Sequence, residues 1–288
     1  MRLSTSTNIY FNRPDGSKAE ITDSITRCAQ AGYRVMDMNF HDCCTFRNGF
    51  VTDRYPDWLE EIACCARDFG VTFSQAHAPF YNFCDDAFPQ KAEMDRLIRR
   101  SIQCAAKLGI PWIVIHAGTD FAAADWRKQS LEKNLRYFRP LLDFAAGEGV
   151  GLAIENLWDL NIAPQRRYTA QPEEVLELVD KLDSPMAGIC CDVEHAAIME
   201  QDPAALLRLF GSQLKATHIS DVIDTAADHL LPFFGKMQWP PIVKALREIG
   251  YTGDFTYEIH RYTAGMPDAL VPDALAYSVK TGEYLLSL

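Results

Sequence analysis

Residues 108–116 read LGIPWIVIH, and this short stretch contains every part of a repeating unit. Gly109 follows a long segment with helical spacing of its apolar residues, and glycine commonly ends a helix in the left-handed conformation. A short connection then leads into WIVI, an apolar run rich in β-branched residues that is typical of a buried strand. The run ends in His116, a polar residue. The stretch therefore predicts a helix end, a short loop, a buried strand and a polar strand end.

The same unit recurs along the whole chain. The predicted strands are Arg2–Ile9, Arg34–Asn39, Thr72–His77, Trp112–His116, Gly151–Asn156, Ala187–Asp192, Leu214–Ile219 and Phe255–His260. The predicted helices are Ile21–Ala31, Asp57–Phe69, Lys91–Leu108, Trp126–Ala146, Glu173–Leu182, Pro203–Phe210, Pro241–Ile249 and Asp273–Leu286, and six of them are followed directly by glycine. Eight βα units predict an α/β protein, a (β/α)8 TIM barrel formed by residues 1–288 as a single catalytic domain. A doubly wound open sheet is the alternative, but the sequence has no G-x-G-x-x-G turn to support it.

The connections at the two ends of the predicted strands differ in length. Those from a helix to the next strand are short, whereas Ala78–Gln90, Leu157–Pro172 and Ser220–Pro240 all run from a strand to the next helix. In a barrel, these long connections lie on the C-terminal face, where active sites are found. The sequence therefore places the candidate active site on that face.

Composition narrows the classes of partner and compartment. The 288-residue chain carries a formal net charge of -11, which argues against binding to a nucleic-acid backbone. It contains nine cysteines, no C-x-x-C pair, no signal-peptide pattern and no apolar run that would suit a membrane span. We therefore expect a cytoplasmic protein that binds a small molecule and does not bind nucleic acid or a membrane. A homo-oligomer is possible.

Polar residues stand at the ends of six consecutive predicted strands. They are His77, His116, Glu155 with Asn156, Asp192 followed by His195, His218 and Glu258 with His260. One such residue is most simply explained as a strand end that faces solvent. Six that converge on one barrel mouth would repel one another unless a cation lay among them.

The residue types favour a particular kind of cation. Glu155, Asp192, His218 and Glu258 offer three carboxylates and one imidazole, which suits Mn²⁺, Mg²⁺, Co²⁺ or Zn²⁺. We therefore predict one divalent metal ion at these four residues. The interpretation of His77 and His116 stays open between a second metal and contacts with substrate hydroxyls.

Around these residues the chain resembles the xylose-isomerase-like TIM-barrel superfamily, which includes the sugar phosphate isomerases and epimerases. The matching pieces are Ile154-Glu-Asn156, Asp192-Val-Glu-His195, Thr217-His-Ile-Ser-Asp221 and Tyr257-Glu258, in the order found in that family. The resemblance implies that Glu155, Asp192, His218 and Glu258 bind one divalent metal. It also implies that His195 contacts substrate and that Glu155 and Glu258 act as the catalytic acid/base pair.

The sequence also departs from two subgroups of this superfamily. Ketose 3-epimerases have a second glutamate and an arginine where this chain has Asn161 and Asp224. The zinc-dependent apurinic endonucleases have a D-x-H pair after strand 7, whereas here the aspartate is displaced by one position and reads Asp228-His229. A close relationship with either subgroup is therefore not expected.

The leading hypothesis is a metal-dependent isomerase or epimerase of a sugar, sugar phosphate or related polyol. A carboxylate removes a proton beside a carbonyl, and the charge that develops on the substrate is stabilised by a divalent cation. A dehydratase or lyase on a keto-polyol would use the same proton abstraction and is the first alternative. An endonuclease-like phosphodiesterase and a non-catalytic sugar-binding barrel are the others.

Further substrate contacts are expected from the loops. Lys236, Arg261 and Arg47 are cations that could meet a phosphate, because barrels often bind one near the last two strands. Loop aromatics, including Phe80 and Phe233, could form a lid or could merely pack the loops.

The adjacent pair Cys190-Cys191 suggests a thiolate site at first sight. Side chains in a strand alternate between its two faces, so both sulfurs cannot reach one metal. If Asp192 points into the barrel, then Cys190 does too, and Cys191 points out toward the helices. We therefore predict that these cysteines pack the protein and do not bind metal.

Overall fold

The computed structural model describes residues 1–45, 48–159 and 166–288. One sheet of eight strands runs in the order β7-β6-β5-β4-β3-β2-β1-β8, with parallel pairing between neighbours. The strands are β1 (Leu3–Ser6), β2 (Val35–Asn39), β3 (Thr72–His77), β4 (Trp112–Ile115), β5 (Gly151–Glu155), β6 (Ala187–Asp192), β7 (Leu214–His218) and β8 (Phe255–Tyr257). A parallel bridge between Ile219 and Tyr257 joins β7 to β8, so the sheet nearly closes and the predicted (β/α)8 barrel is confirmed.

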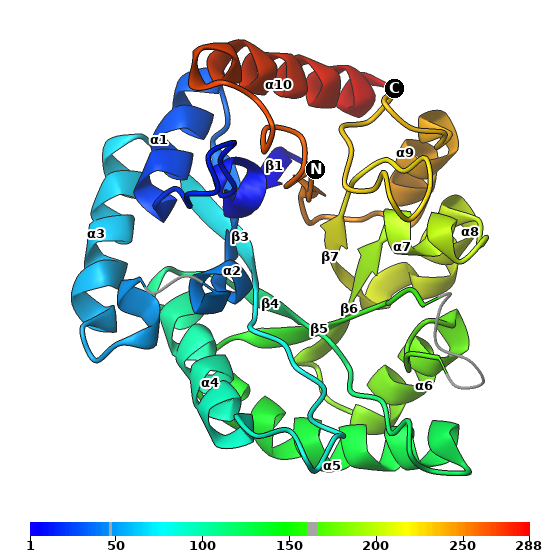
Figure 1. Cartoon of the computed structure of the whole chain (residues 1–288). Helices are drawn as coiled ribbons and strands as arrows, with labels where there is room; N and C mark the ends of the chain where they lie inside the picture. The colour runs from blue at the N-terminus through cyan, green and yellow to red at the C-terminus, as the bar shows by residue number, and fades with distance from the viewer. Residues whose placement is uncertain (46–47, 160–165) are drawn as a thin grey trace.

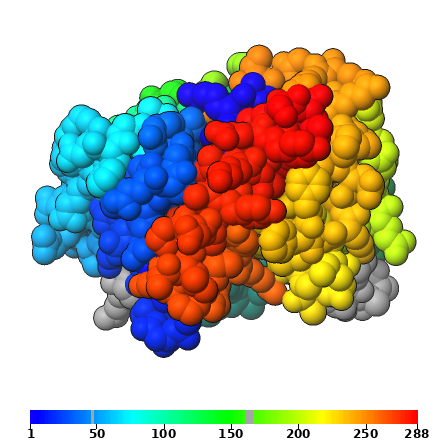
Figure 2. All heavy atoms as spheres, turned by 90° about the horizontal axis from the view of Figure 1, so that it is seen from above, coloured from blue at the N-terminus to red at the C-terminus, as the bar shows by residue number. Residues whose placement is uncertain are grey.

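Helices surround this barrel (Figure 1). The longer ones are α1 (Ile21–Ala31), α3 (Tyr55–Asp68), α4 (Lys91–Lys107), α5 (Trp126–Gly147), α6 (Pro172–Leu182), α8 (Pro203–Phe210), α9 (Trp239–Glu248) and α10 (Val271–Ser287). Two short helices, α2 (Phe40–Thr45) and α7 (Val193–Ile198), directly follow β2 and β6. Figure 2 shows α10 between the N-terminal segment and the segment that contains α9. Within the described residues, no helix combines the length and apolar character needed to cross a membrane.

Most predicted elements are found with boundaries shifted by one to three residues, as three examples show. The first strand stops at Ser6, whose side chain accepts a hydrogen bond from the Asn8 N–H and caps a 3₁₀ turn. The last strand stops at Tyr257, so that Glu258 and His260 lie just beyond it. Helix α5 continues through Gly147, and the glycine in the left-handed region is Gly149, with φ 76°.

The barrel interior on the side of β4 to β7 is small and apolar. Val114, Ala153, Cys190 and Ala216 contact one another there and are fully buried. Trp112 packs against this cluster from below, and a Cβ at Gly151 would come within 2.2 Å of its ring. Glycine at position 151 therefore makes room for the indole that fills the base of the barrel.

The interior on the side of β8, β1, β2 and β3 is polar. Gln75 is central, because its Nε2 donates to Asp37 Oδ2 at 2.8 Å and its Oε1 accepts from the Thr256 hydroxyl at 3.2 Å. All three side chains are buried, and burial raises the pKa of Asp37. The polar interior is thus held by side-chain hydrogen bonds, as buried polar groups require. We call these two interior layers the apolar floor and the polar floor.

Candidate active site

Four candidate metal ligands stand one layer above the two floors. Glu155, Asp192 and His218 each follow a residue of the apolar floor by two positions, and Glu258 follows Thr256 of the polar floor by two. Side chains alternate along a strand, so residues two apart point in the same direction. Glu155, Asp192 and His218 are therefore directed to the C-terminal mouth of the barrel, and Glu258, just beyond the end of β8, lies beside them.

These four side chains converge on one point. His218 Nδ1 lies 3.0 Å from Glu155 Oε1, 3.1 Å from Glu258 Oε2 and 4.0 Å from Asp192 Oδ2. Each of the four residues offers one ligand atom, and these atoms all lie within 4.8 Å of one another. The structure thus brings together the same four residues that the sequence predicts as metal ligands. We call them the carboxylate centre.

Burial strongly affects the ionisation of the carboxylate centre. Burial opposes the charge on Glu155 and Glu258, but the neighbouring His218 reverses this and holds both pKa values below the ordinary range. Asp192 differs, because burial and the negative charge of Glu155 raise its pKa to about 7. The neighbouring imidazoles thus keep Glu155 and Glu258 ionised but do not do the same for Asp192.

The donor set fits a divalent cation. Asp192 Oδ2 is fully buried and makes no hydrogen bond, which is costly for a carboxylate oxygen unless a cation is nearby. The other Asp192 oxygen, Oδ1, accepts the backbone N–H of His195 at 2.8 Å. Asn156 holds the end of β6, since its side chain pairs with both the N–H and the carbonyl of Asp192. Three carboxylates and one imidazole match the preferences of Mn²⁺, Mg²⁺, Co²⁺ and Zn²⁺.

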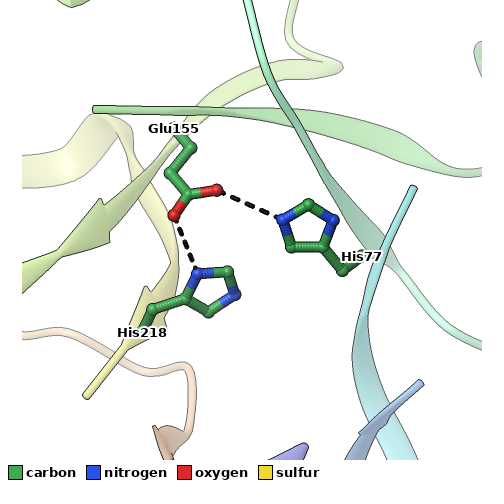
Figure 3. Close-up of side chains that lie close together, drawn as sticks. All are labelled: His77, Glu155 and His218. Atoms are coloured by element: carbon green, nitrogen blue, oxygen red, sulfur yellow. Dashed lines mark hydrogen bonds and ion pairs between the residues drawn. The ribbon is translucent and has the colours of Figure 1, made fainter. Parts of the chain in front are cut away.

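His77 and His116 approach the opposite edge of Glu155. Their Nε2 atoms lie 3.3 Å and 2.9 Å from Glu155 Oε2, while Glu155 Oε1 faces His218. Figure 3 shows Glu155 between His77 and His218. His77 Nδ1 contacts the Ala78 carbonyl at 2.8 Å, which fixes the proton on Nδ1 and leaves Nε2 facing the site. His77, Glu155 and His218 could also hold a cation, and His116 lies outside the candidate ligand sets of the described residues.

His195 reaches the same site from helix α7. Asp192 is the N-cap of this helix, so the chain turns immediately after the carboxylate and carries His195 back over the mouth. His195 Nδ1 lies 2.8 Å from the Asn156 carbonyl, an arrangement that fixes the orientation of the ring. His195 also lines the cavity above the carboxylate centre.

A cavity of about 330 Å³ opens above the carboxylate centre. Its lining residues are Asn8, Asn12, Asn39, His41, Asp42, His77, Phe80, His116, Glu155, Leu157, Arg167, His195, His229, Glu258 and His260. Phe80 stacks on His116 with ring centroids 4.1 Å apart and on His41 with centroids 3.7 Å apart. The cavity thus combines one aromatic wall with many polar groups, which suits a small polyhydroxylated ligand.

Three residues that the sequence suggested as substrate contacts do not line the cavity. Lys236 is exposed, Arg261 pairs with Asp228, and neither is among the described residues that line the cavity. Phe233 is also exposed and packs near Tyr284, away from the cavity lining.

Two further positions discussed from the sequence lie outside the described residues. They are Arg47, considered as a phosphate contact, and Asn161, considered as a departure from the ketose 3-epimerases.

Sequence reasoning missed the residues contributed by the first two strands. Asn8 and Asn12 follow β1, and Asn39, His41 and Asp42 stand at or just past the end of β2. The strand-end rule that found Glu155 would also have found these residues, had it been applied to all eight strands. Asparagine gives a weaker signal than histidine or a carboxylate because it also ends strands without any site.

The two cysteines of the adjacent pair pack in different parts of the core, as predicted. Cys190 belongs to the apolar floor, whereas Cys191 packs in the core between strands and helices. All nine cysteines are free, and burial raises the pKa of the Cys190 thiol to about 12. A neutral buried thiol packs as a small apolar group, so the stretch contributes Asp192 and His195 to the site and not sulfur.

The fold and the site define a (β/α)8 barrel with a carboxylate and imidazole centre at its C-terminal mouth. A family model described as xylose isomerase-like TIM barrel matches residues 25–280, and the chain belongs to this family.

Among curated proteins, an uncharacterised protein of Sinorhizobium fredii is 29% identical over 180 residues, which cover 62% of this chain and 56% of that protein. A D-psicose 3-epimerase of Enterocloster bolteae is 32% identical over 81 residues, 28% of this chain and 25% of the relative. The chain thus matches only part of the length of these relatives.

Solved structures resemble the chain over nearly its full length. A D-psicose 3-epimerase crystallised with D-fructose has a TM-score of 0.76 at 19% identity and covers 100% of both chains. A D-tagatose 3-epimerase-like protein has a TM-score of 0.78 at 18% identity, covering 100% of this chain and 97% of that one. A 3-keto-D-glucoside 4-epimerase from E. coli has a TM-score of 0.74 at 18% identity, covering 97% and 99%. At this identity the likeness establishes the shared fold.

Proposed function

We propose that the protein is a divalent-metal-dependent isomerase or epimerase of a sugar, sugar phosphate or related polyol. The observation that carries this proposal is the convergence of Glu155, Asp192, His218 and Glu258, whose ligand atoms lie within 4.8 Å of one another. The structural likeness to proteins that are named as sugar 3-epimerases and a 4-epimerase supports the same reaction class.

The four residues of the carboxylate centre would hold one divalent cation. When bound, such a cation would act as a Lewis acid that favours loss of a proton from the carbon beside a carbonyl group. Removal of Asp192 or His218 should therefore abolish turnover through loss of the cation, whereas Glu155 and Glu258 have a second role.

Glu155 and Glu258 are the proposed proton-transfer residues. They come from β5 and from the chain just past β8, and His218 lies between them at 3.0 Å and 3.1 Å. One carboxylate takes the proton from the substrate carbon, and the electron pair stays on the substrate as an enediolate. In epimerisation the other residue acts in its protonated form and gives its proton to the opposite face of the same carbon, so the two residues exchange protonation states in each turnover. In isomerisation the proton returns to the neighbouring carbon.

The remaining polar groups would orient the substrate. His77, His116 and His195 line the cavity with ring nitrogens near Glu155, so they are placed to bond hydroxyl groups close to the reacting carbon. Phe80 offers an aromatic face, which suits the C–H surface of a sugar ring or chain.

The proposed substrate is given only as a class, because one contact that would narrow it is missing. At the position where ketose 3-epimerases carry arginine, this chain has Asp224, which caps a turn by accepting the N–H groups of Ala226 and Ala227. Asp224 therefore stabilises the loop, and a substrate contact from this position is not proposed.

Cytoplasmic location also stays a prediction from the sequence.

Proton exchange in D₂O tests the proposed function. The protein is loaded separately with Mn²⁺, Mg²⁺, Co²⁺ or Zn²⁺ and incubated with D-fructose, D-psicose, D-tagatose and a 3-keto-D-glucoside. We expect deuterium beside the carbonyl of at least one sugar, together with an epimer or isomer, measured by NMR after the metal is removed. E155Q and E258Q should lose this exchange while E283Q, an exposed glutamate on α10, keeps it.

Other products would redirect the proposal. Loss of water from a keto-polyol would identify a dehydratase that uses the same carboxylates. Cleavage of a duplex with an abasic site would indicate a phosphodiesterase. Absence of exchange with every metal and sugar, or full activity of both E155Q and E258Q, would contradict the assignment.

A further inference from the structure

A second ionic cluster borders the same cavity and has no part in the proton transfer described above. It consists of the buried Glu194 and Asp228, the partly buried His229 and the half-exposed Arg261, and we call it the rim cluster. His229 Nδ1 lies 3.3 Å from Glu194 Oε1 and 3.6 Å from Asp228 Oδ1, and Arg261 Nε lies 2.8 Å from the same Asp228 oxygen. Glu194 is fully buried and Asp228 nearly so.

Cationic side chains already contact the rim cluster, although burial raises the pKa of Glu194 to about 7. Glu194, Asp228 and His229 have the spacing of a metal site, and Arg261 forms an ion pair with Asp228 Oδ1. Glu194 Oε1, Asp228 Oδ1 and His229 Nδ1 are buried and make no hydrogen bond, so they contact their neighbours as ion pairs. Two carboxylates then face one guanidinium and one imidazolium. Burial alone would lower the pKa of His229, but Asp228 and Glu194 outweigh it and raise the pKa to about 9.

Glu194 holds His229 at two points. Its Oε2 accepts the His229 backbone N–H at 2.6 Å, and its Oε1 lies next to Nδ1 of the same residue. The backbone of His229 is in the left-handed region, with φ 51°, and its ring lies 4.0 Å from that of His260. Such a conformation persists where the surroundings determine it. The carboxylate thus fixes both the backbone and the ring.

This arrangement leaves one edge of the ring for a ligand. Within the described residues, the ion pairs of the His229 ring run through Nδ1, and the residue lines the cavity beside Glu258 and His260. With Nδ1 turned to Glu194 and Asp228, Nε2 is the atom that remains available to the cavity.

We propose that His229 is a substrate-binding residue, which donates a hydrogen bond from Nε2 to a hydroxyl or carbonyl oxygen of a polyhydroxylated ligand. Glu194 is then a positioning residue, because it acts only through His229. The inference rests on the proposed function in one respect, namely that the cavity binds a sugar or polyol. It adds a binding contact on the side of the cavity formed by the loop after β7.

NMR of histidine ring nitrogens tests this contact directly. Full-length protein with ¹⁵N-labelled histidine is loaded with Mg²⁺ or Zn²⁺, and D-fructose, D-psicose or D-tagatose is added. The His229 signals are assigned by their loss in H229Q. We expect at least one ketose to shift the Nε2 signal of His229. E194Q should reduce that shift and weaken the ketose about tenfold, as the loss of an oriented hydrogen bond to a charged group would. E283Q serves as the matched control.

The outcomes separate this inference from the proposed function. If a ketose shifts His77 or His195 but leaves His229 unmoved, or if E194Q binds it as well as wild type, the role of His229 is overturned and the proposed function stands. If no ketose shifts any histidine signal, both fail together. A second equivalent of Zn²⁺ that is lost in E194Q would show that the rim cluster is a metal site and would also overturn the inference.

Discussion

The carboxylate centre and the rim cluster are two ionic groups built in part from one short stretch, Asp192 to His195. In the carboxylate centre three carboxylates surround His218, with His77 and His116 at the far edge of Glu155, and Asp192 Oδ2 makes no hydrogen bond. In the rim cluster two carboxylates contact His229 and the half-exposed guanidinium of Arg261, and Glu194 Oε1, Asp228 Oδ1 and His229 Nδ1 also make no hydrogen bond. Spacing and missing hydrogen bonds alone would make both of them metal sites. The difference is the guanidinium, a permanent cation beside Asp228, so the cations already present distinguish the two clusters better than the spacing does.

The largest expected effect separates the two clusters by metal affinity. D192N should weaken binding of Mn²⁺ or Zn²⁺ at least about 100-fold, since loss of a direct ligand exceeds the effect of losing an outer contact. E194Q should bind the metal as tightly as wild type. Calorimetric titration of chelator-treated protein measures both. Equal weakening by the two substitutions would show that the clusters act as one site.

The next largest effect concerns how the rim cluster makes the free energy of unfolding depend on pH. The folded pKa of His229, about 9, lies above its ordinary value, so its stabilisation is complete below about pH 6.5 and is lost as pH rises through 9. We expect the free energy of unfolding of wild type to fall by about 3 kcal/mol over this interval relative to H229Q. Urea unfolding at several pH values measures this difference. Parallel pH profiles of wild type and H229Q would contradict it.

A smaller effect concerns proton release at the carboxylate centre. Burial and Glu155 raise the pKa of Asp192 to about 7, so Asp192 holds a proton below that pH in the metal-free protein. A metal must displace this proton and also the proton of His218, whose pKa lies well above its ordinary value although burial opposes this. Affinity should therefore rise about a hundredfold per pH unit below pH 7 and about tenfold per unit just above it. Calorimetry in buffers of different ionisation enthalpy counts the protons released. A rise of only about tenfold per pH unit below pH 7 would show that Asp192 is already ionised and that His218 alone releases a proton.

The smallest expected effect tests the cysteine beneath the carboxylate centre. C190A removes a buried sulfur from the apolar floor and should lower the free energy of unfolding by about 1 kcal/mol, while metal affinity stays within about twofold. C191A provides the matched control from the outer face of the same strand. Loss of metal in C190A alone would make Cys190 a ligand.

The sequence predicted the carboxylate centre well because its residues stand at strand ends in a regular barrel. Period-two alternation fixes which way Glu155, Asp192 and His218 point, whatever the surrounding loops do. The sequence did not predict the position of Glu194. Helix α7 begins directly after Asp192, so the alternation of side chains along β6 does not continue to Glu194. Its partner His229 lies 35 residues further on, in a long loop with a left-handed backbone that strand periodicity does not describe.

The packed base of the barrel determines how a ligand can reach the cavity. A hollow of about 410 Å³ on the far side reaches Trp112, but the fully buried layer of Val114, Ala153, Cys190 and Ala216 lies between it and the cavity. The barrel is therefore a cup with one opening, not a tunnel. A ligand of the cavity must therefore enter and leave by the same opening at the rim. In the proposed function, the product must leave through this opening before the next substrate can enter.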